Sequence, residues 1–216
     1  MWPWSGVDWS DWSYSEEHGV VMLKIDYIVN SFFDSMTWLL SDEGSSWVWL
    51  VDCGDVEPII EKIGGKSIAG VLLTHAHFDH IYGLPELLER YPDCRIYTNE
   101  VGRETLGNAK LNMSLYHETP LTVEGPQICI CGEGNDIELF ENISAKVYET
   151  PGHHPSCLTF RVEDNLFTGD AFIPGIKVVT NLPKGDKKQA QVTLERIKTL
   201  AKGKKIRPGH NGKEES

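Results

Sequence analysis

The sequence has no long apolar run. None of its apolar stretches approaches the ~20 residues that a membrane-spanning helix needs. The N-terminal residues Met1-Trp2-Pro3-Trp4-Ser5 lack the basic region and the apolar core of a secretory signal. We therefore expect a cytoplasmic protein that has no membrane partner.

Cysteine is also scarce, and its number is odd. There are five cysteines: Cys53, Cys94, Cys129, Cys131 and Cys157. An odd count with irregular spacing is not typical of a disulfide framework. Cys129 and Cys131 alternate along a predicted strand, which explains such a pair better than metal binding does. We expect Cys157 to be buried as a small apolar residue rather than to act as a nucleophile.

Basic residues are too few for a nucleic-acid partner. The chain has 32 acidic and 20 basic residues, which give a formal net charge of −12. No basic stripe is visible in the sequence, so we expect a small-molecule substrate and no nucleic acid. The oligomeric state is left open by the sequence.

The length and the composition predict one domain with an N-terminal arm. A chain of 216 residues is long enough to bury a core without disulfides. We divide it into a Trp-rich arm (1–19) and a single domain (20–216). The arm is expected to pack loosely on the domain. The alternative is a lip over the site or an oligomer contact.

Short runs of β-branched and aromatic residues, separated by turn residues, predict strands. The predicted strands are 20–28, 36–40, 47–52, 68–73, 95–97, 127–131, 136–140, 145–150, 157–162, 165–168 and 204–207. Helices are predicted at 56–63, 83–90, 100–106 and 186–202, and the polar segment 107–126 is expected to be a substrate-side loop. The strands from residue 127 onward form a second series, so each half would have a sheet and outer helices. This pattern predicts an α/β fold in the form of a four-layer αββα sandwich.

One segment, Thr74-His75-Ala76-His77-Phe78-Asp79-His80, carries most of the chemical information. Imidazole and carboxylate together suit Zn²⁺ or non-haem iron. Residues two apart on a strand face the same side, so we expect His75 and His77 to reach one metal from the strand end. Asp79 and His80 would lie in the following turn and reach a second ion. The alternative is a chance histidine cluster on a loop.

Later segments each place a metal-binding residue after a predicted strand. These segments are Thr150-Pro151-Gly152-His153-His154-Pro155, Leu166-Phe167-Thr168-Gly169-Asp170 and Arg207-Pro208-Gly209-His210. A single Gly-Asp or Gly-His pair is usually an ordinary turn. Together with the first cluster, and in this order, they indicate a metal site.

With these motifs, the chain resembles the metallo-β-lactamase fold superfamily, and within it the small single-domain relatives of glyoxalase II (hydroxyacylglutathione hydrolase). The stretch from Leu182 to Asp186 also matches. The resemblance implies that His75, His77 and His153 hold a first metal. It implies that Asp79, His80 and His210 hold a second, with Asp170 bridging the two. Asp52 matches a turn near the metals, where it would orient a ligand imidazole.

The resemblance also implies an activity. It implies two Zn²⁺ ions as cofactors, with iron and manganese as the alternative metals. A hydroxide that bridges the metals would attack a thioester or a similar ester-type carbonyl, and Asp79 would steer it as the catalytic residue. We expect His154 to be a loop histidine without a role in the site, and His18 and His117 to be surface residues. The printed sequence ends six residues after His210, so we expect the helical domain that grips glutathione to be absent.

Other functions remain open at this level. A persulfide dioxygenase would use one iron and fewer of these ligands. A lactonase or another hydrolase of the same fold would use the same constellation on a different substrate. A β-lactamase of the branch best suited to penicillins would carry a cysteine in place of Asp170. A relative that processes RNA would need more basic charge. From a different class, the chain could be a metal-bound module without catalytic activity.

Overall fold

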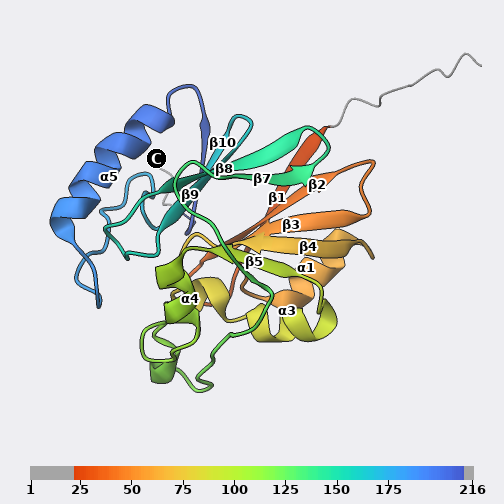
Figure 1. The fold of residues 1–216 in the computed structure, drawn as a ribbon, viewed down its shortest axis with the longest axis horizontal. Coiled ribbons are helices and arrows are strands. Elements are labelled where there is room, and N and C mark those ends of the chain that lie inside the picture. Colours follow the sequence, from red (N-terminus) through yellow and green to blue (C-terminus); the bar gives the residue numbers. More distant parts are fainter. Residues whose placement is uncertain (1–21, 212–216) are drawn as a thin grey trace, which may run out of the picture.

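The computed structural model describes residues 22–211, so the predicted arm (1–19) and His18 lie outside the described residues. Two β-sheets lie face to face, with helices on both outer sides (Figure 1). The predicted α/β fold, a four-layer αββα sandwich, is confirmed. The domain boundary at residue 20 stays a prediction.

In the first sheet, the strands lie side by side in chain order. Their bounds are β1 (Leu23–Val29), β2 (Met36–Asp42), β3 (Trp47–Val51), β4 (Ser67–Leu72), β5 (Arg95–Thr98) and β6 (Ile128–Ile130). The strands β1 to β3 pair antiparallel, whereas β3 to β6 pair parallel. Because parallel strands end at the same edge of a sheet, the segments that follow β3 and β4 emerge together.

The second sheet has the order β11-β10-β9-β8-β7. Its strands are β7 (Asp136–Phe140), β8 (Ile143–Glu149), β9 (Leu158–Val162), β10 (Asn165–Gly169) and β11 (Lys205–Pro208). The pair β10 and β11 is parallel, and the other pairs are antiparallel. Consequently β8, β10 and β11 all run in one direction and end at the same edge.

The helices are divided between the two outer faces. They are α1 (Val56–Ile63), α2 (Phe78–Ile81), α3 (Leu84–Arg90), α4 (Glu100–Leu106) and α5 (Lys187–Leu200), and a 3₁₀ turn η1 lies at Ser114–Tyr116. Figure 1 shows α1, α3 and α4 below the first sheet and α5 on the far side of the second. The side chain of Asp186 caps α5 by accepting hydrogen bonds from the amides of Lys188 and Gln189.

Alternation along the strands separates the buried side chains into three cores. In β2, Trp38 and Leu40 pack in the central core against residues of the second sheet such as Phe160, whereas Leu39 packs with the helices. The helix-side core contains Ile59, Ile63, Leu84, Leu87 and Leu106. A smaller core beneath α5 includes Leu166 and Ile197. Three cores require four layers, since residues two apart on a strand share a face.

Two indole rings join the sheets by hydrogen bonds. The Nε1–H of Trp49 in β3 donates to the carbonyl of Leu139 in β7 over 2.9 Å. The Nε1–H of Trp38 in β2 donates to the carbonyl of Pro208 in β11 over 3.0 Å. These bonds satisfy polar atoms inside an apolar interface, where an unpaired group would be costly.

Three predictions about local structure need correction. The segment predicted as strand 127–131 is β6, which belongs to the first sheet because it pairs with β5, Ile96 with Ile128. The strand before the motif ends at Leu72, so His75 and His77 lie beyond it, where strand alternation does not act. Asp79 and His80 lie in α2 rather than in a turn, because the amide of Tyr82 donates a hydrogen bond to the carbonyl of Phe78 over 3.0 Å.

No helix in the described part of the chain has the length and apolarity to cross a bilayer.

Candidate metal centre

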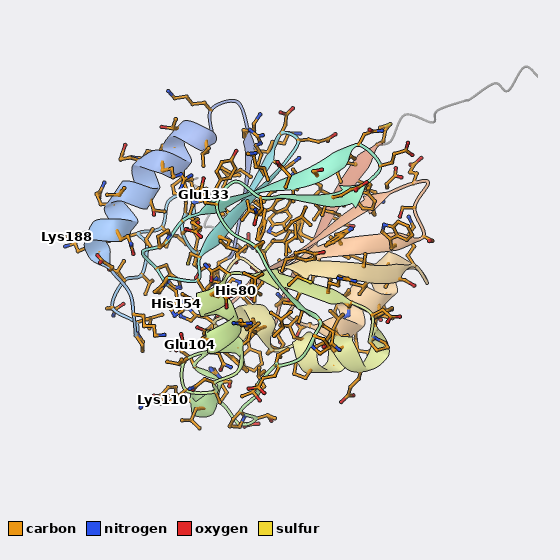
Figure 2. The ribbon with its side chains drawn as sticks, in the orientation of Figure 1. His80, Glu104, Lys110, Glu133, His154 and Lys188 are labelled. Atoms are coloured by element: carbon orange, nitrogen blue, oxygen red, sulfur yellow. The ribbon has the colours of Figure 1, made fainter. Side chains whose placement is uncertain are left out.

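The predicted site residues all follow the ends of strands that share one edge of the sandwich. They come after β3 (Asp52), β4 (His75, His77, Asp79 and His80), β8 (His153), β10 (Asp170) and β11 (His210). Figure 2 shows the labelled His80 near the middle of the molecule, away from the outer faces of the helices. The two sheets thus bring together residues that are far apart in the sequence.

His75, His77 and His153 form the first group. One nitrogen atom from each ring lies within 4.8 Å of the others. The Nε2 atom of His153 is 3.0 Å from Nδ1 of His77, and all three rings are buried. The predicted first set of ligands is therefore assembled in space.

The second group contains Asp79, His80 and His210. The Nε2 atoms of His80 and His210 are 3.3 Å apart, and each lies near the Asp79 carboxylate, at 3.4 Å and 3.2 Å. His80 is fully enclosed, whereas Asp79 and His210 remain partly exposed. This group thus has an open side.

Asp170 lies between the two groups. Its Oδ2 atom is 3.6 Å from Nε2 of His153 and 3.3 Å from Nε2 of His210. Its Oδ1 atom is 3.5 Å from Nε2 of His80. One carboxylate therefore reaches both groups, which is the position that the resemblance implies for a bridge.

The donor atoms fit a metal better than they fit one another. Nε2 of His75 and Oδ1 of Asp170 are buried and have no hydrogen-bond partner. Buried polar atoms normally have a partner, so such a pair needs an explanation. Imidazole nitrogens with carboxylate oxygens form a donor set suited to zinc, iron or manganese. The residues present fit a pair of such ions.

Asp52 fixes the orientation of His80, as predicted. Its Oδ2 atom lies 2.9 Å from Nδ1 of His80. A carboxylate only accepts, so Nδ1 carries a proton and Nε2 is the nitrogen that faces the site. The carboxylate is itself held by the amide and the hydroxyl of Thr74, both at 2.7 Å.

Backbone carbonyls hold two further imidazoles. Nδ1 of His210 donates to the carbonyl of Phe33 at 2.9 Å, and Nδ1 of His153 donates to that of Val179 at 2.8 Å. Each bond occupies Nδ1 and leaves Nε2 facing the site, where a metal can replace its proton. Sequence reasoning missed these two supports, because a carbonyl carries no residue-type signal.

Charge differs between the two groups. Burial, followed by the neighbouring imidazoles, lowers the pKa of His75 well below its usual range and that of His77 to about 3. Burial also opposes charge at His80, but Asp79, Asp170 and Asp52 outweigh it and raise the pKa of His80 to about 9. At His210, hydrogen bonds to Asp170 and Asp79 outweigh burial and raise the pKa to about 11.

The carboxylates show the complementary shift. Burial alone would raise the pKa of Asp79 and Asp170, but the histidines around them, His80 first, lower it by more. Both carboxyls are therefore ionised near neutral pH. They attract positive charge to the second group and to the bridge.

His154 lies in a loop, as predicted, but it is buried, and His117 was wrongly predicted to be a surface residue. His154 is only 1% exposed, and its Nδ1 lies 2.7 Å from the hydroxyl of Ser156. Burial, then His153 and Lys184, lowers the pKa of His154 to about 4. His117 is half-buried, because its ring stacks on Phe78 with centroids 3.8 Å apart. Both rings fill space beside the site, which a loop position in the sequence does not reveal.

Cys157 is buried, as predicted. Desolvation raises the pKa of its thiol far above the usual range. A thiol in this state does not form the thiolate that nucleophilic catalysis requires.

Sequence comparison relates the chain to a large family. The profile of the metallo-beta-lactamase superfamily matches residues 31–210. A hydroxyacylglutathione hydrolase of Xylella fastidiosa (strain 9a5c) is 32% identical over 183 residues, which are 83% of this chain and 61% of that protein. Another, of Tolumonas auensis, is 26% identical over 179 residues, 82% of this chain and 61% of the relative. The chain thus spans about three-fifths of the length of these curated relatives.

Solved structures share the fold at lower identity. The BLEG-1 B3 metallo-beta-lactamase has a TM-score of 0.78 at 23% identity, covering 87% of this chain and 92% of that one. TTHA1623 in a di-iron-bound form has a TM-score of 0.72 at 24% identity, covering 86% and 92%. ETHE1 from Myxococcus xanthus has a TM-score of 0.69 at 22% identity, covering 89% and 78%. Since the family profile covers most of its length, this chain belongs to the metallo-beta-lactamase superfamily.

Proposed function

We propose that the protein is a hydrolase with two metal ions, which cleaves a thioester or a similar ester-type carbonyl of a small molecule. The observation that carries this proposal is the position of Asp170. Its carboxylate lies within 3.3 to 3.6 Å of histidines from both groups. Two-metal hydrolytic sites are built around such a shared ligand.

Each ion has its own set of protein ligands. His75, His77 and His153 would hold one ion, whereas Asp79, His80 and His210 would hold the other. When bound, a pair of zinc ions supplies a nucleophile by lowering the pKa of a bound water to about 7, and it polarises the carbonyl of the substrate. Zinc is our first choice of metal, with iron as the competitor.

The chain's own residues would orient the reactants. Asp79 is partly exposed beside His210, so its carboxylate can accept a hydrogen bond from the attacking water. The water oxygen bonds to the acyl carbon, and the bond from that carbon to sulfur or oxygen breaks. The proton from the water ends on the leaving thiolate or alkoxide. The products are the free acid and a thiol or an alcohol.

The relatives support this choice of reaction. Hydroxyacylglutathione hydrolases, by their name, hydrolyse a hydroxyacyl derivative of glutathione, and one of them matches over 83% of this chain. The chain spans 61% of that relative's length. The acyl group and the thiol of its own substrate are therefore part of the proposal.

A persulfide dioxygenase with one iron is the second candidate. One structural neighbour was solved in a di-iron-bound form, which makes iron a metal worth testing. The assembled group of Asp79, His80 and His210 favours two ions over one. A module that binds metal without catalysis is the third reading, and turnover distinguishes it from the others.

The experiment combines metal content with turnover. Protein purified without added metal is analysed for its elements and assayed with S-lactoylglutathione and simpler thioesters. About two zinc ions per chain with turnover would support the proposal. One iron per chain, with oxygen uptake on glutathione persulfide, would overturn it. Asp170→Asn should lose turnover while retaining its fold, which circular dichroism checks.

A further inference from the structure

A cavity of about 660 Å³ is lined by Phe78 and Tyr82, which precede and follow Asp79 and His80 of the second metal group in the chain. Aromatic side chains line it from three separate segments: Phe32 in the β1–β2 turn, Phe78 and Tyr82 in and after α2, and Tyr116 and His117 in the 107–126 loop. Small-molecule sites have volumes of about 300–1,000 Å³ and mostly apolar walls. The cavity therefore has the size and the lining of a ligand site.

Contacts between these aromatic rings preform the walls of the cavity. The Phe32 ring meets Phe78 at 5.0 Å and Tyr82 at 4.9 Å, both edge to face. His117 stacks on Phe78 at 3.8 Å and contacts Phe32 at 5.7 Å. These contacts tie the loop to the metal-binding motif. Even so, Phe32 remains 38% exposed and Tyr116 67% exposed, so apolar surface is left for a ligand to cover.

The cavity shares its framework with the metal site. Phe78 lies in the chain between His77 and Asp79, so its Cα is about 3.8 Å from each of theirs. The turn that carries Phe32 also carries Phe33, whose carbonyl holds His210 at 2.9 Å. A substrate whose carbonyl lies at the second metal group can thus extend a substituent along these rings.

Charge around the cavity selects against anions. Among the described residues that line it are two carboxylates, Glu86 and Glu118, and no lysine or arginine. The Oε1 atom of Glu86 lies 2.7 Å from Nη2 of Arg90, and the Glu86 side chain is 47% exposed. A ligand with an anionic tail would meet Glu118 without a compensating cation, which costs binding energy.

We propose that this cavity binds the uncharged, apolar acyl chain of the substrate, and that the 107–126 loop sets the preference for chain length. The inference rests on the proposed function, because it assigns the acyl side of the same reaction. Thioesters with long, neutral acyl chains are then better substrates than short ones or those ending in a carboxylate.

The kinetic test uses N-acetylcysteamine thioesters with the metal-loaded enzyme. Butanoyl, hexanoyl and octanoyl thioesters should show a kcat/KM that rises by up to about fourfold for each added methylene. The 7-carboxyheptanoyl thioester, similar in length to octanoyl but anionic, should fall about tenfold or more below it. Flat dependence on chain length, with all thioesters hydrolysed, would overturn this inference and leave the proposed function intact.

Variants locate the effect in the cavity. Thr119→Trp places a large ring among the lining residues. It should reduce the octanoyl rate to about the butanoyl level. Val192→Trp, on α5 at a position 71% exposed, introduces the same side chain elsewhere and should change neither rate. Glu118→Gln should narrow the gap between the octanoyl and the 7-carboxyheptanoyl thioesters.

A binding measurement separates the two proposals. Octanamide, which is neutral and lacks a thioester, should bind metal-free protein more tightly than butanamide in NMR titrations, and Thr119→Trp should remove the difference. Octanamide binding without thioester turnover would retain the cavity and overturn the hydrolase. Equal binding of the two amides would overturn the cavity assignment whatever the turnover.

Discussion

The Oδ2 atom of Asp52 lies 2.9 Å from Nδ1 of His80 and 2.7 Å from the hydroxyl of Thr74. Asp52 reaches this position with a left-handed backbone (φ 60°), which Asp and Asn tolerate better than most residues. One buried carboxylate therefore holds both the start of the motif and the His80 ring, which belongs to the proposed second metal group.

Asp52→Asn should weaken the second metal site. The Oδ2 atom accepts two hydrogen bonds, and an amide NH₂ in its place can accept neither. Loss of such a support typically weakens metal affinity about tenfold to hundredfold. Competition with a chromophoric chelator measures the change. Asp55→Asn is the matched control, since Asp55 contacts Ser31 and Tyr82 rather than an imidazole.

Gly209→Ala should displace Asp170, the proposed bridging ligand. A Cβ atom at Gly209 would lie 2.4 Å from Oδ1 of Asp170 and 2.9 Å from Cε1 of His80, so the site must shift. We expect loss of bound metal and a free energy of unfolding lower by about 1–3 kcal/mol. Elemental analysis and urea unfolding check both effects. Gly44→Ala, whose Cβ would make only an ordinary contact at 3.4 Å, should leave the metal content unchanged.

Trp49→Phe tests the bonds between the sheets. The change leaves the buried carbonyl of Leu139 without its indole donor, which should cost about 1–3 kcal/mol of the free energy of unfolding. Trp47→Phe, two residues earlier at a position 45% exposed, should change it by about 0.5 kcal/mol or less. Equal effects of the two changes would contradict the role of this hydrogen bond.

Thiol labelling should find one accessible cysteine. Burial raises the pKa of Cys53 and Cys157 far above the usual range, and that of Cys94 and Cys131 to about 12. Cys129 is the remaining thiol and is partly exposed. Ellman's reagent on native protein should show one fast phase, and Cys129→Ser should remove it. More than one fast thiol would mean that the buried cysteines are less enclosed than described.

Sequence reasoning predicted the layers, and it selected residues that the fold brings together, for a physical reason. Short apolar runs such as Trp47–Val51 indicate strands that are buried on both faces, and that pattern is local. Side chains that could hold a metal are likewise visible as residue types, so the strand-end motifs at His153, Asp170 and His210 could be recognised. Their grouping needed the family resemblance, because spacing does not reveal which loops meet.

The missed features depend on contacts between distant segments. β6 was assigned to the wrong sheet because its pairing with β5 leaves no mark in its three residues. The burial of His154 and the stacking of His117 on Phe78 arise from loops that meet only in the fold. The carbonyls of Phe33 and Val179 accept hydrogen bonds from His210 and His153. Every residue has a backbone carbonyl, so the residue type does not reveal such an acceptor.

Adding zinc to metal-free protein while following thioester hydrolysis tests the central claim most directly. A site with two ions bridged by Asp170 predicts that activity rises with added zinc and reaches its plateau at about two equivalents per chain. A plateau at one equivalent, or metal binding without hydrolysis, would contradict the account.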